Sequence, residues 1–167
     1  MLELGKAGTA GTEKGTLPVL AGGSPAATLR TAKVRDAATA VVGGEEWLFT
    51  RSRNGLVGRR AGEPEDTERF RAAQPSWWRG LWEIDLDGTR LQMRTASAWR
   101  GTHRYSRDGR TVAESGFTGR WLRLPTLTVH EVLPLPAQVF LLWVELVLTR
   151  RSAAGAGAGA AVAGAAG

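Results

Sequence analysis

The stretch from 137 to 149 constrains the fold more than any other part of the chain. Only Gln138, Glu145 and Thr149 are polar in it, and the apolar residues between them fall on every side of a helix. A bilayer-spanning helix needs about 20 consecutive apolar residues, so this run is too short. A helix that is apolar all round must instead be enclosed. The rest of the chain is rich in strand patterns, and a single sheet covers only one face of a helix. The sequence therefore predicts a barrel that closes around a C-terminal helix at 137–150.

The flanks of this segment support a helix. Pro134 and Pro136 can start a helix but not extend it backwards. Arg150 and Arg151 suit the negative end of a helix dipole. Two alternatives stay open: the helix packs into a dimer or against an open sheet, or it forms a short membrane anchor together with 153–167. The anchor ranks last because it would place both arginines inside the bilayer.

Hairpin patterns dominate the middle of the chain. In LWEIDLDGTRLQMR, residues 81–94, apolar and acidic residues alternate up to Asp87-Gly88, whose two residues can take the positive φ of a tight turn. The dipeptides Asn54-Gly55 and Asp108-Gly109 are turn signals of the same kind, and 119–132 is typical of a further strand pair. Connections this short favour pairing between neighbours. The sequence predicts a mainly β fold, an antiparallel meander of roughly eight to ten strands.

The two ends of the chain differ from the middle. Residues 1–25 are rich in Gly, Thr and Ala without an apolar period, which predicts a disordered N-terminal tail. Residues 152–167 are almost wholly Ala and Gly and read as a low-complexity tail. One β-barrel-like domain is then expected over 26–151.

Three segments together resemble the tubby-like barrel superfamily, which includes the phospholipid-scramblase and LURP-one-related proteins. They are LWEIDLDGTRLQMR, the following RDGRTVAESGF, and the ending LPLPAQVFLLWVELVLTRR. The resemblance covers 26–151 at most, and it implies a closed antiparallel barrel of about a dozen strands around one hydrophobic helix. It also implies a non-enzymatic role, often at membrane lipids. No phosphoinositide-binding or calcium-binding residue set of that superfamily matches here.

Positive charge indicates the class of ligand. The net charge is +6, and 19 of the 22 basic residues are arginine, which favours polyanions such as anionic lipid or nucleic acid. The candidate lipid or phosphate contacts lie in two groups. One group flanks the Asn54-Gly55 turn, and the other is the WWR of QPSWWRG; together they are Arg51, Arg53, Arg59, Arg60, Trp77, Trp78 and Arg79. A solvated turn and a barrel plug are the competing structural interpretations.

Catalytic and metal chemistry have little support in the sequence. There is no cysteine, and His103 and His130 lack the spacing of a metal site. Ser115 sits in AESGF, which lacks the first glycine of a nucleophile elbow. Glu83 and Asp85 are expected on a solvated strand face. The sequence predicts no enzyme, no metal and no cofactor.

The leading hypothesis is a non-enzymatic binding protein that associates with anionic membrane lipid surfaces. A carrier of a small apolar ligand inside the barrel is the first alternative. A nucleic-acid-binding module is the second and weaker one, because no RNA-module aromatic motif occurs. The N-terminus lacks the basic start and apolar run of a secretory signal. A cytoplasmic protein, peripheral at the membrane, is therefore expected.

Overall fold

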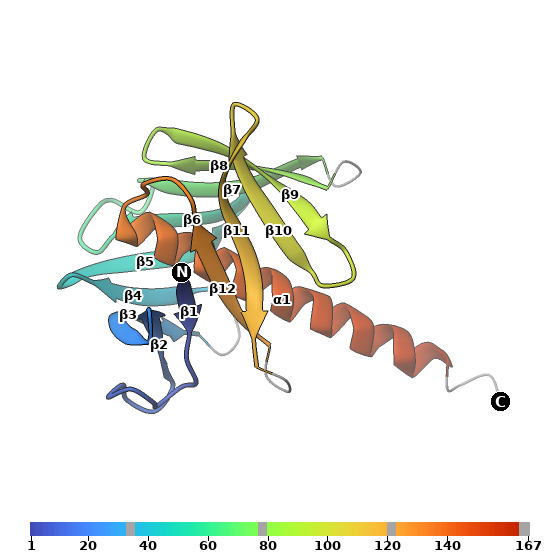
Figure 1. The fold of residues 1–167 in the computed structure, drawn as a ribbon, viewed down its shortest axis with the longest axis horizontal. Helices are drawn as coiled ribbons and strands as arrows, with labels where there is room; N and C mark the ends of the chain where they lie inside the picture. Colours follow the sequence, from blue (N-terminus) through green and yellow to red (C-terminus); the bar gives the residue numbers. More distant parts are fainter. Residues whose placement is uncertain (33–35, 77–79, 120–122, 164–167) are drawn as a thin grey trace.

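The computed structural model of the protein describes residues 1–32, 36–76, 80–119 and 123–163. Its strands form a closed antiparallel barrel in which every strand pairs with its neighbours in the chain and β1 pairs with β12 (Figure 1). One helix of the described residues, α1, runs through the barrel (Figure 1). The strands are β1 (Leu2–Leu4), β2 (Thr16–Ala21), β3 (Ser24–Thr31), β4 (Ala38–Val42), β5 (Glu45–Ser52), β6 (Gly55–Arg60), β7 (Phe70–Ser76), β8 (Leu81–Leu86), β9 (Thr89–Ser97), β10 (Thr102–Arg107), β11 (Arg110–Thr118) and β12 (Leu124–Val129). The expected β fold around a helix is confirmed, with twelve strands in place of eight to ten.

Tight turns close the hairpins largely as the sequence predicts. Asp87 and Asp108 take φ of 54° and 51°, each followed by a glycine with positive φ. The third hairpin is shifted by one residue, because Ser52 pairs with Gly55 and the turn is Arg53-Asn54. Gly55 opens β6 where a Cβ would lie 2.1 Å from the carbonyl oxygen of Ala72. The close approach of β6 and β7, and not the turn itself, therefore requires a glycine at this position.

The N-terminal segment is part of the barrel, so the predicted disordered tail at 1–25 was wrong. Leu2 and Leu4 of β1 and Leu17 and Val19 of β2 are buried in the core. β1 pairs with β2 on one side and with β12 on the other, and thereby closes the sheet. The prediction was based on local composition. The strands β1 and β2 are short and become stable only when α1 and β12 pack against them.

Helix α1 (Leu135–Ala163) fills the barrel as the apolar run predicts. Its residues from Val139 to Val147 are all buried, and Phe140 and Trp143 each lie 5.4 Å from the ring of Phe49. The helix continues well past residue 150 and projects from the barrel toward the C-terminus (Figure 1). The segment expected as a low-complexity tail is therefore helical as far as Ala163.

The meander gives the barrel two distinct ends. Successive connections alternate between them, and α1 enters at one end after β12. The entry end comprises the connections 22–23, 43–44, 61–69, 87–88, 108–109 and 130–134. Of the described residues, the exit end comprises 5–15, 32, 36–37, 53–54, 80, 98–101, 119 and 123, together with the emerging α1 at Arg150 and Arg151. Arg150 and Arg151 contact Thr31 and Asp36 there, which fixes the direction of the helix.

Candidate functional site at the exit end of the barrel

The two ends of the barrel carry opposite charge. Among the described residues of its connections, together with Arg150 and Arg151 of the emerging helix, the exit end has seven basic and two acidic side chains, an excess of five positive charges. They are Lys6, Lys14, Arg53, Arg100, Arg123, Arg150 and Arg151, against Glu13 and Asp36. The connections of the entry end, which are described throughout, have seven acidic and one basic side chain. They are Glu63, Glu65, Asp66, Glu68, Asp87, Asp108 and Glu131, against Arg69. The strand residues that border these connections add Glu45, Arg60, Arg107 and Arg110, which leaves an excess of four negative charges at the entry end. The modest net charge of the chain thus conceals a strongly polarised molecule.

One acid at the exit end is already neutralised. Arg151 donates two hydrogen bonds to Asp36, of 3.1 and 2.6 Å, and Arg51 lies 3.9 Å from the same carboxylate. Arg150 donates to the hydroxyl of Thr31 at 3.2 Å. These contacts hold the emerging helix against the β3–β4 connection. They also leave the exit end with little negative charge to oppose an anionic ligand.

Four of the seven tryptophans belong to the described residues, and they differ sharply in burial. Trp47, Trp82 and Trp143 are buried in the core. The fourth, Trp99, lies in the exit-end connection between β9 and β10, and its side chain is 94% exposed. Trp77, Trp78 and Trp121 lie outside the described residues.

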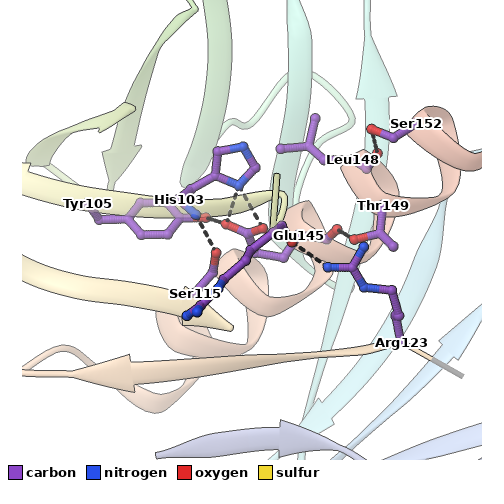
Figure 2. A network of polar contacts seen from close by, with 9 residues as sticks. His103, Tyr105, Ser115, Arg123, Glu145, Leu148, Thr149 and Ser152 are labelled. Carbon is purple, nitrogen blue, oxygen red and sulfur yellow. Dashed lines mark hydrogen bonds and ion pairs between the residues drawn. The ribbon is translucent and has the colours of Figure 1, made fainter. Parts of the chain in front are cut away.

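A buried polar network lies just inside the exit end (Figure 2). The carboxylate of Glu145 is fully buried and accepts a 2.6 Å hydrogen bond from the hydroxyl of Tyr105. Nδ1 of His103 lies 2.9 and 3.1 Å from the two carboxylate oxygens. The backbone N–H of His103 donates to Oγ of Ser115 at 2.7 Å. About three turns of mainly apolar helix thus precede one charged group whose hydrogen-bond partners are in place.

Strand β10 is shaped to supply those partners. The register shifts between Thr102 and His103 toward β9, and between Tyr105 and Ser106 toward β11. Such bulges re-aim side chains locally. Burial, together with the nearby negative charge of Glu145, raises the pKa of Tyr105 well above its ordinary value of 10.0. The phenol therefore stays protonated and remains a hydrogen-bond donor to Glu145.

The structure separates the arginines that the sequence placed at one hairpin tip. Arg51 and Arg53 lie at the exit end, but Arg59 and Arg60 lie at the far end of β6. There Arg59 donates to the carbonyl of Glu63 at 2.7 Å. Arg60 lies 3.6 Å from the carboxylate of Glu45 and 5.3 Å above the ring of Trp47. The grouping failed because Arg59 and Arg60 are a whole strand away from the turn.

The second predicted group, Trp77, Trp78 and Arg79, lies outside the described residues. The sequence around this group contains a repeat that the sequence-based prediction did not use. The tripeptide Trp-Arg-Gly occurs at 78–80 and again at 99–101, before β8 and before β10. Gly80 and Gly101 both have positive φ, of 56° and 65°. The repeat could have identified Trp99 and Arg100 as a second candidate from sequence alone.

A groove of about 1240 Å³ crosses the outer wall over β7 to β10. Arg71, Asp85 and Arg90 occupy neighbouring register positions on its floor, and Arg90 lies 3.9 Å from Asp85. Asp85 also accepts a 2.8 Å hydrogen bond from the N–H of Gly88. Mixed charges therefore line this groove, and the acidic residues of β8 lie on the solvated strand face that the sequence predicts. The exit end is the more uniformly charged surface.

Metal-ligand clusters are absent from the described part of the chain, where no three His, Asp or Glu side chains could hold an ion together. His130 lies 3.4 Å from Glu114, which Arg104 also contacts at 2.9 Å. Those contacts lower the pKa of Glu114, with Arg104 as the larger cause. This is an exposed ion-pair cluster on the outer wall, which suits a structural role.

Comparison with known proteins found no matching family model, curated protein or solved structure. Within the described residues, no helix has the length and apolar character needed to cross a membrane.

Proposed function

We propose that the chain is a non-enzymatic binding protein that docks its exit end on an anionic lipid surface. The opposite charge of the two barrel ends carries this proposal. A negatively charged surface attracts the exit end and repels the entry end, so the field both draws the protein in and orients it. About 1 kcal/mol is typical for each basic residue close to an anionic membrane, so several together give substantial binding.

The alternatives have less support. A carrier needs space inside the barrel, where Phe140, Trp143 and Phe49 pack against one another instead. A nucleic-acid binder would use the same arginines, which makes it an outcome to test. A barrel around one helix agrees with the fold that the tubby-like resemblance implies, and membership of that superfamily stays a prediction. Architecture alone does not define an activity, so the proposal rests on the charges.

Co-sedimentation with vesicles tests the proposal. The full chain should pellet with vesicles containing phosphatidylserine and remain in the supernatant with phosphatidylcholine alone. Raising the salt to about 1 M, where the Debye length is about 3 Å, should release it. Arg53→Glu should weaken binding, whereas Arg90→Glu on the outer wall is the matched control and should bind like the unaltered chain. Equal partitioning onto both vesicle types would overturn the proposal.

A further inference from the structure

Trp99 is the least explained side chain of the described molecule. Tryptophan combines a large apolar ring with one polar N–H, and it is highly buried in most folded proteins. Here the ring is 94% exposed at the tip of the β9–β10 connection. Core packing needs no such residue at this position. An exposed large aromatic side chain on a connection is instead typical of a binding contact.

The backbone around Trp99 is held in place although the ring is free. Oγ of Ser97 accepts a 3.3 Å hydrogen bond from the N–H of Arg100. The carbonyl of Arg100 accepts a hydrogen bond from the guanidinium of Arg123, which ties this connection to the one between β11 and β12. Gly101 supplies the positive φ that returns the chain to β10. A pre-ordered loop loses less conformational entropy on binding than a mobile one.

Charge and place define the chemistry of the ligand. Arg100 follows Trp99 directly, and Arg123 reaches the same loop while its guanidinium also lies 4.3 Å over the ring of Phe117. Tryptophan is enriched at the level of lipid headgroups, where its ring meets apolar chains and its N–H stays wet. Arginine beside it can bind headgroup phosphates. A lipid leaflet satisfies both residues at once.

We propose that Trp99 is an interfacial anchor that inserts among the headgroups of an anionic leaflet, with Arg100 and Arg123 bound to phosphate beside it. The inference rests on the proposed function and adds the loop that enters the membrane. It also fixes the orientation: the exit end faces the lipid and the acidic entry end faces away.

A fluorescent label reports whether this loop enters the membrane. The chain has no cysteine, so Ala98→Cys gives one attachment site for an environment-sensitive dye. With phosphatidylserine vesicles, the dye at residue 98 should shift to the blue and be quenched by nitroxide-labelled lipids. A dye on Thr67→Cys, at the entry end, is the matched control and should show neither change. Unlabelled variants with the same thermal unfolding curve as the parent chain establish that both are folded.

Affinity provides the second readout. Trp99→Ala should weaken binding to phosphatidylserine vesicles by about tenfold or more, because an indole buries far more apolar area than a methyl group. Val132→Ala removes another fully exposed apolar side chain, at the entry end, and should change nothing.

The outcomes separate the two proposals. Vesicle binding with a dye at residue 98 that stays in water would overturn the anchor and leave the proposed function standing. Failure of the unaltered chain to prefer anionic vesicles would overturn both. A dye response to single-stranded DNA, without one to vesicles, would identify the loop as a base-stacking platform and also reject the lipid anchor.

Discussion

At the scale of the residue, the feature that matters most is Glu145, a charged side chain buried in the apolar interior of the barrel. Burying a carboxylate without partners costs several kcal/mol, so Glu145 depends on Tyr105 and His103. His103 is 16% exposed at its side chain and connects the network to the solvent at the exit end. Tyr105 is fully buried and donates the shortest hydrogen bond of the network, which makes it the residue whose protonation the fold most requires.

Alkaline titration tests that requirement. The folded pKa of Tyr105 is raised, so its contribution to stability is complete below the unfolded value of 10.0 and is lost as the pH rises above it. Tyr105 is the only tyrosine of the chain, so the ultraviolet absorbance of tyrosinate reports this residue alone. We expect that absorbance to rise together with the loss of near-ultraviolet circular dichroism. Titration near pH 10 in a protein that stays folded would contradict the burial of the hydroxyl.

At the scale of the element, the question is what sets the rotation and the depth of helix α1 inside the barrel. A helix that is apolar on all sides has no polar stripe to set its rotation or its depth within the barrel. Buried polar groups can supply that specificity, as they do for register in coiled coils. Glu145 bonds to two residues of one strand, β10, and so favours one rotation and one depth of α1.

A double-mutant cycle measures this coupling. Its four members are the parent chain, Glu145→Met, Tyr105→Phe and the double variant. The double variant should lose clearly less free energy of unfolding than the sum of the two single variants, because it leaves neither the carboxylate nor the phenol without its partner. Outside the cycle, Glu145→Ala should lower the free energy of unfolding by about 3–5 kcal/mol, since it leaves a cavity and two unpaired polar groups. Denaturant unfolding provides all four values. Strict additivity would show that the two side chains do not act as a pair.

Closure governs stability at the scale of the whole molecule. A closed barrel has no unpaired strand edge, and here the seam is made by β1 between β2 and β12. Without the first two strands, β3 and β12 would become edges, and part of α1 would meet water. The segment that looks least structured in the sequence therefore completes the fold.

Truncation distinguishes the two termini. Deletion of residues 1–21 should abolish cooperative unfolding and promote aggregation, because it exposes two strand edges and apolar core. Deletion of 153–167 is the matched control and should leave the midpoint of thermal unfolding nearly unchanged, since residues 153–155 are exposed. Calorimetry and light scattering measure both effects. A folded, monomeric protein without β1 and β2 would contradict the role assigned to the seam.

Sequence alone determined the enclosed helix, the Asp-Gly hairpins and the β class of the fold, because each depends on the order of residues within one short segment. The closure by β1 and the meeting of Glu145 with Tyr105 and His103 were decided only by the tertiary structure. These contacts join residues about 40 or more positions apart, and no local period encodes them. The same holds for the two charged ends: acids and bases alternate along the chain, and they separate only because successive connections lie at opposite ends of the meander.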